Sequence, residues 1–372
     1  MNRKVRVLHI SPSIRGYGAE RLVIELLSHL KSRDVDAALL TIYEPPEEVR
    51  ATLPFPVLTA GRKNRGDRLF LWRLVREIRS FRPDIVHTHT HVGRYWGRIA
   101  ALCSGVPQII HTEHNPCDFR KKSAVESLAD WILNRGTSRI VTFFNEQGSR
   151  VSKLEHFPMR KVVMIPNGLE LPEPNEDRLA ARARLAIRPN EFAILLVGRM
   201  EYQKNHILAL RAFSALLRQT KEKALLLFVG AGENEDMLRG LARALNIADR
   251  VRFLGYRNDV PSLLRAADLL LMTSWFEGMP LAALEAMTAG IPVVTTPWLG
   301  ASDMLDNGRY GFLAADFEPF NVAAQIERAI ARPMIRRSVA ERAKQHALDA
   351  YGVDRMVDAH QQLYLQLSGI AS

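Results

Sequence analysis

The stretch LLLMTSWFEGMPLAALEAM, residues 269–287, decides the fold of this chain. Its first five residues, Leu269–Thr273, are apolar or β-branched and have the length of a strand that is buried on both faces. A five-residue loop follows, and Pro280 suits the first turn of a helix because its φ is already helical and that position needs no N–H donor. A buried strand that leads through a short loop into a helix predicts a parallel α/β sheet.

The same alternation of apolar strands and helical patterns runs along the whole chain. It falls into two series on either side of residues 165–177, which are rich in Pro, Asn and acidic residues, as an exposed linker is. We therefore expect one Rossmann-like domain at residues 1–168, a second at residues 177–350, and a helix within residues 351–372 that docks back onto the first domain. The expected strands are Val5–Ile10, Ala37–Tyr43, Asp84–Thr88, Gln108–Thr112 and Ile140–Phe144 in the first series, and Phe192–Val197, Ala224–Val229, Val251–Phe253, Leu269–Thr273 and Pro292–Thr295 in the second.

The composition is that of a globular protein with more than one core. The 372 residues are 47% hydrophobic and 24% charged, and a chain of this length fits two domains. The apolar runs are far shorter than the ~20 residues of a membrane-spanning helix, and the apolar part of the N-terminus is too short for a signal peptide. Two cysteines do not make a disulfide framework, so we expect a cytoplasmic protein.

The net charge of +11 is confined to the first half of the chain. Residues 1–165 contain 27 Lys and Arg against 16 Asp and Glu, whereas the charges of the remaining residues balance. A basic surface favours an anionic partner, which is a phosphate compound, a lipid surface or a nucleic acid.

Two cations and a helix start predict an anion site in the second half. Arg199 and Lys204 follow the first strand of the second series, and open α/β sheets bind ligands at the carboxyl ends of their strands. Arg and Lys together neutralise a diphosphate, and the first helical turn near Met279–Ala282 offers N–H donors. Glu285, eight residues after Glu277, suits the paired hydroxyls of a ribose or hexose. The alternative is solvated surface charge.

A glycine-containing loop, GYGAER at residues 16–21, follows the first strand. Glycines at such a turn let a phosphate approach the N–H groups of a helix start. However, Arg21 stands where a dinucleotide fingerprint has its third glycine. A flexible loop without a ligand is therefore an equal alternative.

The histidines suggest a metal site only at first sight. His87, His89 and His91 alternate, so on a strand they would share one face. No nearby thiolate or carboxylate completes a zinc ligand set, and we expect no metal there. The single D-x-D, from Asp34 to Asp36, fits a solvated turn before the second strand.

Together these motifs resemble the retaining, nucleotide-sugar-dependent glycosyltransferases of family 4 (glycosyl transferases group 1), which have the GT-B fold. The resemblance spans nearly the whole chain and is strongest from Val162 to Leu313. It implies two Rossmann-like, doubly wound α/β domains that face each other across a cleft, the second holding the donor nucleotide sugar and the first the acceptor. The motifs that carry it are PNG at 166–168, LLVGRMEYQKN at 195–205, FVGAGENEDML at 228–238, VRFLGYRNDV at 251–260, SWFEGMPLAALEAMTAGIPVVTT at 274–296 and NGRYGFL at 307–313.

The resemblance implies a role for each matching residue. Arg199 and Lys204 would clamp the donor diphosphate, and Glu285 would take the ribose hydroxyls. Glu277 would hold sugar hydroxyls beside the reacting carbon, and His114 matches the sugar-contacting histidine of the family. The expected site therefore comprises catalytic Glu277, His114, Arg199 and Lys204, and substrate-binding Gly18, Gly278, Met279, Pro280, Leu281 and Glu285.

Two positions depart from the family pattern. Tyr17 replaces the first of two paired glycines in the first loop, and Asp303 replaces the glutamate of a Gly-x-x-Glu motif. The resemblance otherwise implies a metal-independent hexosyl or glycosyl transferase with no cofactor. Such an enzyme moves a sugar from a UDP- or GDP-sugar to a glycan or lipid-linked acceptor in cell-envelope or exopolysaccharide assembly, and no nucleic-acid partner is expected.

Residues 66–81, GDRLFLWRLVREIRSF, predict an amphipathic helix with a basic face. Leu69 and Trp72 lie among the arginines of that face, as in helices that lie on a membrane surface. One expected partner is an anionic membrane, bound through Arg68, Trp72 and Arg76 at the inner face of the plasma membrane. The alternative is a packed crossover helix with a solvated arginine face.

A protein of another class fits the same fold. It is a catalytically silent carbohydrate- or nucleic-acid-binding protein that uses the basic half of the chain. The presence of Arg199, Lys204, Glu277 and Glu285 discriminates against it, because a protein that has lost catalytic activity does not need all four residues. A nicotinamide-dependent oxidoreductase is opposed by Arg21.

Overall fold

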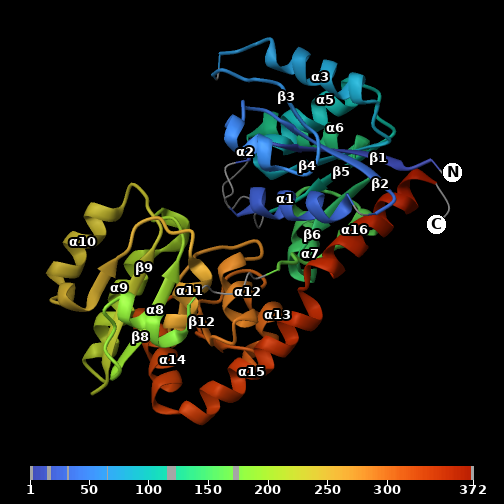
Figure 1. The fold of residues 1–372 in the computed structure, drawn as a ribbon. Helices are drawn as coiled ribbons and strands as arrows, with labels where there is room; N and C mark the ends of the chain where they lie inside the picture. Colours follow the sequence, from blue (N-terminus) through green and yellow to red (C-terminus); the bar gives the residue numbers. More distant parts are fainter. Residues whose placement is uncertain are drawn as a thin grey trace. The chain divides into compact units, whose positions relative to one another are not determined.

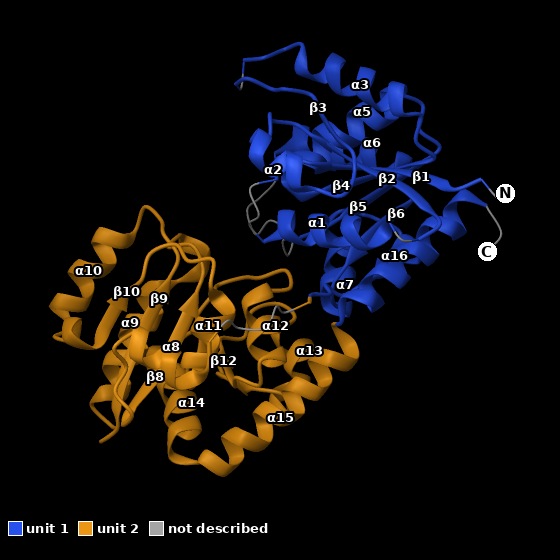
Figure 2. Cartoon of the chain, viewed as in Figure 1, with its two compact units in different colours: residues 1–169, 352–372 blue, residues 170–351 orange. Residues whose placement is uncertain are grey.

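The structure is a computed structural model that describes residues 3–14, 18–31, 33–64, 66–114, 123–170 and 176–369. The chain divides into two compact units, one of residues 1–169 and 352–372 and the other of residues 170–351 (Figure 2). Each unit is built on one parallel sheet with helices packed against it (Figure 1). Among the described residues, none of the helices combines the length and the apolar composition that a membrane span requires.

Unit 1 contains a seven-stranded sheet in the order β3-β2-β1-β4-β5-β6-β7. The strand order reverses between β1 and β4, whose register places His9 beside His87. In sheets of this kind, ligands bind beside such a reversal at the carboxyl ends of the strands. The strands are β1 (Val5–Ser11), β2 (Val35–Thr41), β3 (Val57–Thr59), β4 (Ile85–His89), β5 (Gln108–Thr112), β6 (Arg139–Thr142) and β7 (Val162–Met164). The helices are α1 (Ala19–Leu30), α2 (Glu47–Thr52), α3 (Phe70–Phe81), α4 (Thr90–Val92), the π-helical turn η1 (Gly93–Gly97), α5 (Arg98–Cys103), α6 (Ala124–Gly136), α7 (Asn145–Leu154), the 3-10 turn η2 (Met159–Lys161) and α16 (Val353–Ser368).

Helix α16 belongs to unit 1 although it lies at the far end of the sequence (Figure 1). It packs against α1 and β1, and its Val357 and Tyr364 are fully buried. The chain returns to unit 1 where Leu169 pairs with Gly352. A Cβ atom at Gly168 would lie 2.7 Å from the Gly352 carbonyl oxygen, so this crossing requires a glycine.

Unit 2 contains a six-stranded parallel sheet in the order β10-β9-β8-β11-β12-β13, which reverses between β8 and β11. Its core lies between the sheet and α9 and α14, where Ile194, Phe213, Phe228 and Ile326 are fully buried. The strands are β8 (Glu191–Val197), β9 (Lys223–Val229), β10 (Val251–Phe253), β11 (Leu269–Met272), β12 (Val293–Thr295) and β13 (Phe312–Leu313). The helices are α8 (Arg178–Arg184), η3 (Tyr202–Lys204), α9 (His206–Leu217), α10 (Glu235–Ala244), η4 (Ala248–Arg250), α11 (Val260–Ala266), α12 (Leu281–Thr288), α13 (Ala301–Leu305), η5 (Asp306–Gly308), α14 (Pro319–Ala331) and α15 (Pro333–Ala350).

The two parallel sheets confirm the predicted fold class, and all ten predicted strands are present with ends shifted by at most two residues. The strands that the sequence does not predict are β3, β7 and β13. All three are edge strands of two or three residues, too short to show a pattern of their own.

Two local predictions were wrong. Asp36 lies within β2 rather than in a turn, where its Oδ2 accepts a hydrogen bond from Arg6 Nε at 3.0 Å. Helix α3 begins at Phe70, so Arg68 and Leu69 precede it rather than forming part of it. Both errors concern the position at which an element starts.

Candidate active site

An ion pair between Lys204 and Glu277 joins the two strands at which the sheet of unit 2 reverses. Lys204 follows β8 and Glu277 follows β11, and the Lys204 Nζ atom lies 2.6 Å from Glu277 Oε1. The hydroxyl of Ser274 donates to the same carboxylate oxygen at 2.6 Å. Glu277 is only 5% exposed, so the opposite charge of Lys204 and the hydrogen bond from Ser274 replace the contacts with water that its carboxylate loses on burial.

Further hydrogen bonds hold the two loops that carry this pair together. The Thr273 hydroxyl donates to the carbonyl oxygens of Lys204 and Asn205, both at 3.0 Å. From the other loop, the Gln203 side-chain amide donates to the carbonyl oxygen of Phe276 at 3.0 Å. The Trp275 N–H returns a bond to the carbonyl of Gln203 at 2.9 Å. The ammonium and the carboxylate are therefore preorganised by backbone and side-chain contacts.

Residues Gly278–Leu281 lead into α12, which begins at Leu281. Pro280 is the N-cap residue with φ −73° and ψ 121°, so the prediction that it lies in the first turn was wrong by one position. The first helical hydrogen bonds run from the N–H groups of Ala283 and Leu284 to the Pro280 carbonyl. The N–H groups of Leu281 and Ala282 consequently lie outside the helical ladder, at the positive end of the helix dipole. Glu285 is in the second turn and is 4% exposed.

Arg199 is placed differently from Lys204. Its side chain is 64% exposed and pairs with Glu201, with 2.8 Å between Nη1 and Oε1. The backbone beside it is enclosed by the loop after β9, which the sequence does not assign to the site. A Cβ at Gly230 would lie 2.1 Å from the Gly198 carbonyl oxygen, and one at Gly232 would lie 2.5 Å from that of Met200. These two glycines allow the loop to approach the end of β8.

In unit 1, His114 is the terminal member of a chain of hydrogen-bonded side chains, here called the histidine chain. The other members are Thr112, His87, Tyr364, His9 and His89, which come from β5, β4, α16, β1 and β4. The links are Thr112 Oγ1–His87 Nε2 (2.7 Å), His87 Nδ1–Tyr364 OH (2.7 Å), Tyr364 OH–His9 Nε2 (3.3 Å), His9 Nδ1–His89 Nε2 (3.0 Å) and His89 Nδ1–His114 Nε2 (3.2 Å). His114 retains partial exposure, whereas the other members are at most 3% exposed.

Burial keeps the histidine chain uncharged. It lowers the pKa of His9 and of His114 from 6.5 to about 3. Burial, followed by repulsion from the neighbouring imidazoles, also lowers the pKa of His87 and of His89 well below 6.5. The phenolic pKa of Tyr364 is raised by burial. All members are therefore neutral near pH 7.

The alternation of His87, His89 and His91 does not bring three imidazoles together. Strand β4 ends at His89, and the ring of His91 lies against Tyr95 instead. His9 of β1 takes its place, and ring nitrogens of His9, His87 and His89 lie within 4.8 Å of one another, close enough to share a metal ion. All six ring nitrogens of these three residues already take part in hydrogen bonds of the histidine chain.

A buried charge cluster supports the segment that leads to His114. The guanidinium of Arg94 lies 2.9 Å from the carboxylate of Glu113, 3.1 Å from that of Asp130 and 2.7 Å from that of Glu155. These carboxylates raise the pKa of Arg94 against the effect of its burial. The carbonyl of Glu113 also accepts a bond from Gln147 Nε2 at 2.8 Å. The sequence does not predict this cluster, because its members are far apart along the chain.

Gly18 precedes α1 with φ 44°, a conformation that favours glycine. Gly16 and Tyr17 of the same predicted loop lie outside the described residues. The structure therefore places the glycine that the family resemblance selects at the start of the first helix of unit 1.

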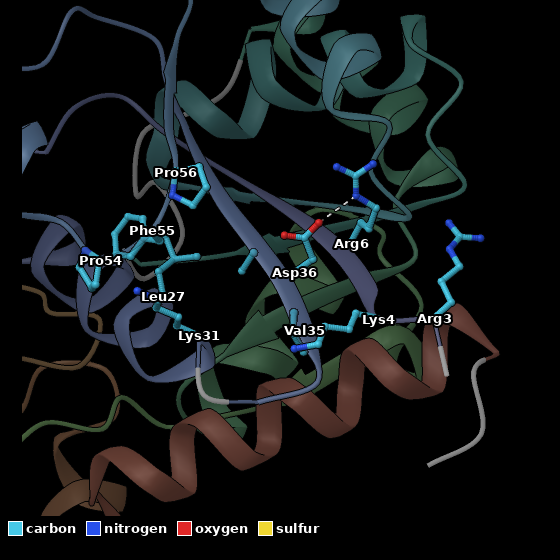
Figure 3. Close-up of a pocket in the computed structure, with 11 residues that line it drawn as sticks. Arg3, Lys4, Arg6, Leu27, Lys31, Val35, Asp36, Pro54, Phe55 and Pro56 are labelled. Atoms are coloured by element: carbon cyan, nitrogen blue, oxygen red, sulfur yellow. Dashed lines mark hydrogen bonds and ion pairs between the residues drawn. The ribbon is translucent and has the colours of Figure 1, made fainter. Parts of the chain in front are cut away.

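The structure contains a cavity in each unit, one remote from the candidate site residues and one beside the loops of the Lys204–Glu277 pair. One of about 510 Å³ in unit 1 is lined by Arg3, Lys4 and Val35, at the amino-terminal ends of β1 and β2 (Figure 3). It is therefore at the edge opposite to the one where parallel sheets bind ligands, and we do not assign the site to it. The second cavity, of about 600 Å³ in unit 2, is lined by Tyr202 and Trp275. Each of these residues lies two positions before a member of the Lys204–Glu277 pair in the sequence.

Family models match both halves of the chain. Residues 17–172 match the model described as Glycosyltransferase Family 4, and residues 177–346 match the model described as Glycosyl transferases group 1. A curated relative, the UDP-Gal:alpha-D-GlcNAc-diphosphoundecaprenol alpha-1,3-galactosyltransferase of Escherichia coli, is 26% identical over 382 residues, covering 98% of this chain and 97% of the relative. The D-inositol 3-phosphate glycosyltransferase of Actinosynnema mirum is 28% identical over 284 residues, covering 71% of this chain and 68% of the relative.

Solved structures of the GT-B fold are similar over nearly the whole chain. HepE of Anabaena, in complex with UDP and glucose, has a TM-score of 0.85 at 21% identity, covering 98% of this chain and 100% of the other. WaaG, a glycosyltransferase involved in lipopolysaccharide biosynthesis, has a TM-score of 0.76 at 18% identity, with 96% and 99% covered. The protein thus has the GT-B fold, and its two halves match two models of one family. The chain belongs to the family 4 glycosyltransferases (glycosyl transferases group 1).

Proposed function

We propose that the protein is a retaining transferase that moves a sugar from a UDP-sugar to a lipid-linked acceptor in cell-envelope or exopolysaccharide assembly. The observation that carries the proposal is the Lys204–Glu277 ion pair, whose carboxylate is buried, at the reversal point of the unit 2 sheet and shortly before the start of α12 in the sequence. The choice of donor and acceptor is supported by the full-length similarity to a galactosyltransferase whose name specifies UDP-galactose and a diphosphoundecaprenol-linked sugar.

In this proposal unit 2 binds the donor. As the bond to the sugar breaks, positive charge develops on the sugar and negative charge on the departing diphosphate. Lys204, Arg199 and the N–H groups at the start of α12 stabilise that diphosphate without a metal ion, and each such donor contributes on the order of 3–4 kcal/mol in the transition state. Glu277 orients the sugar hydroxyls and Glu285 accepts hydrogen bonds from the ribose hydroxyls.

The anomeric configuration of the sugar is retained because the acceptor hydroxyl attacks the anomeric carbon on the same face that the diphosphate leaves. The leaving phosphate accepts the proton of that hydroxyl. Glu277 then has no need to act as a covalent nucleophile. Its bond to Lys204 supports this division, because an ion-paired carboxylate is a weaker nucleophile. Unit 1 binds the acceptor, and we assign to its His114 a hydrogen bond to a sugar oxygen, as the family resemblance implies.

A lipid-linked acceptor requires access to a membrane surface, and we propose the region of α3 for that contact. Leu69 and Trp72 are 67% and 62% exposed, and the Arg76 guanidinium lies 5.5 Å from the Trp72 ring centre. Arg73 does not contribute, because it donates inward to the Ala60 carbonyl and pairs with Asp67. Exposed aromatic and basic side chains together are typical of surfaces that bind anionic lipid.

A donor-hydrolysis screen tests the proposal. The full chain is incubated with UDP-, GDP- and ADP-sugars, with and without EDTA, and the released nucleoside diphosphate is identified. We expect UDP from at least one UDP-sugar, at a rate that EDTA leaves unchanged and that Lys204→Met lowers on the order of a hundredfold or more. Release of no nucleotide would contradict the transferase proposal, and loss of release in EDTA would contradict metal independence.

A further inference from the structure

The histidine chain links His114 to the interior of unit 1 and to α16 through five consecutive hydrogen bonds. Each neutral imidazole has one N–H donor and one lone pair, and each hydroxyl donates one hydrogen. The Tyr364 oxygen could accept from both His87 and His9, but its own buried hydrogen would then lack an acceptor. Every link therefore has one donor and one acceptor, and the Tyr364 hydroxyl donates within the histidine chain, only if all five hydrogen bonds point in the same direction. Two proton orders satisfy this condition, one running from Thr112 to His114 and the other running back.

The hydroxyl of Thr112 decides between the two orders. If the order starts at Thr112, its O–H donates to Nε2 of His87 and is satisfied. In the reverse order that hydroxyl accepts from His87, and its own hydrogen needs another acceptor. Within the described ranges the hydroxyl has no hydrogen-bond partner besides His87, and Thr112 is 3% exposed. A buried donor without an acceptor is unfavourable, so the order that starts at Thr112 is the stable one.

Following that order along the chain assigns every proton. His87 donates from Nδ1 to the Tyr364 oxygen, and the Tyr364 hydroxyl donates to Nε2 of His9. His9 and His89 both donate from Nδ1, so His114 accepts at Nε2 from His89. A neutral His114 whose Nε2 accepts a hydrogen bond has its proton on Nδ1.

We propose that His9, His87, His89 and Tyr364 are positioning residues that hold His114 as the Nδ1–H tautomer, so that it presents a hydrogen-bond donor to an oxygen atom of the sugar. That His114 meets the sugar rests on the proposed function, whereas the tautomer rests on the histidine chain alone. One consequence is that His114 does not act as a base through Nδ1. Another is that a hydroxyl on the C-terminal helix, 250 residues distant in sequence from His114, determines what that ring offers to a ligand.

Histidine tautomers in the full-length protein test this directly. In protein labelled with ¹⁵N-histidine, long-range proton–nitrogen correlation spectra identify the protonated nitrogen of each ring, and His114→Asn assigns the signals of His114. We expect Nδ1–H for His9, His87, His89 and His114 in the wild type. Tyr364→Phe interrupts the chain between His87 and His9, and we expect His114 to become a mixture of both tautomers.

Two matched variants separate this effect from general loss of structure. Tyr351→Phe removes another buried tyrosine hydroxyl that contacts a histidine, His346 at 3.3 Å in unit 2, and should leave the signals of His114 unchanged. Thr112→Val removes the donor that starts the order and should mix the tautomers, whereas Thr112→Ser keeps a hydroxyl and should restore the wild-type pattern. In Tyr364→Phe only part of the protein population has His114 in the Nδ1–H form that donates to the sugar. The value of kcat/KM for donor hydrolysis should therefore fall about two- to fivefold in this variant.

Several results would overturn the proposal. They are Nε2–H on His114 in the wild type, an unmixed Nδ1–H tautomer in Tyr364→Phe, or a stoichiometric metal ion in the purified protein, since a metal would occupy the lone pairs that the order uses. Unchanged kcat/KM in Tyr364→Phe with mixed tautomers would overturn the role toward the sugar. If the wild type hydrolyses no nucleotide sugar, the proposed function fails, but the spectra still decide the tautomer.

Discussion

Glu277→Gln tests whether the Lys204–Glu277 pair holds the two loops of the candidate site together. The substitution keeps the shape of the side chain and removes its negative charge. It leaves the ammonium group of Lys204, now 2.6 Å from a carboxylate oxygen, beside a neutral amide. The hydroxyl of Ser274 still finds an acceptor oxygen, and the long hydrogen bond from Gln203 Nε2 to Glu277 Oε2, at 3.4 Å, is lost together with the charge.

The burial of Lys204 and Glu277 determines how far the substitution lowers the free energy of unfolding. Removing one partner of a fully buried ion pair costs about 3–5 kcal/mol, because the other charge is left buried and unpaired. The side chain of Glu277 is 6% exposed, but that of Lys204 keeps 23% exposure, and water compensates part of its charge. We therefore expect Glu277→Gln to lower the free energy of unfolding by about 2–3 kcal/mol.

Urea unfolding of the full chain, followed by circular dichroism, measures this change. The control is Glu235→Gln, which breaks the Arg239–Glu235 pair of the same unit at the same kind of distance, 2.7 Å, but with side chains that are 43% and 30% exposed. An exposed pair within one helix is worth about 0.5 kcal/mol or less. In a double-mutant cycle with Lys204→Met, the losses should fall short of additivity by about 1–3 kcal/mol.

The reasoning is refuted by either of two results. One is a Glu277→Gln protein that is no less stable than the Glu235→Gln control. The other is a double variant whose loss equals the sum of the two single losses. In both cases the pair would not organise the loops, and the preorganised site described here would be wrong.

Three further predictions concern other parts of the molecule. Glu285→Ala should weaken UDP binding in calorimetry about ten- to hundredfold, because a charged hydrogen-bond acceptor is lost; an equal weakening in Glu277→Ala would contradict the separate roles given to the two carboxylates. Arg76→Glu and Trp72→Ala should weaken sedimentation with anionic vesicles, and this binding should decrease as salt is added. The control Trp131→Ala, at another exposed tryptophan, should leave the binding unchanged. Vesicle binding that is absent or indifferent to salt would contradict the membrane proposal. The histidine chain has pKa values below those of the unfolded state, so the unfolded chain binds more protons as pH falls through 6.5. Stability is then complete above pH 6.5 and decreases toward pH 4, by at most about 1.4 kcal/mol per histidine and pH unit; a melting temperature that is constant from pH 7 to pH 5 would argue against neutral buried rings.

The fold was predictable because its elements are locally encoded. The strand, loop and helix of residues 269–287 show their lengths and breaks in sequence, and β11 and α12 appear where the pattern puts them. Short edge strands such as β13 were not predictable, because two residues paired on one side carry no signal beyond that of a loop.

The candidate site was predictable only in part. Lys204 and Glu277 were both expected in the site from the family resemblance, but their direct pairing depends on the reversal of strand order between β8 and β11, which the sequence does not specify. The histidine chain was missed for the same reason. His9 and His87 become neighbours only because β1 pairs with β4, and Tyr364 joins them from a position 277 residues away from His87.

The most direct test of the central claim is transfer itself. The full chain is given a radiolabelled UDP-sugar, UDP-galactose or UDP-glucose, together with a lipid that carries a diphosphate-linked N-acetylglucosamine, and the label in the extracted lipid is measured. The proposal predicts labelled lipid whose new linkage keeps the anomeric configuration of the donor, and a rate that Lys204→Met lowers on the order of 10²–10³-fold. Failure to transfer from any UDP- or GDP-sugar, or transfer that Lys204→Met leaves intact, would contradict it.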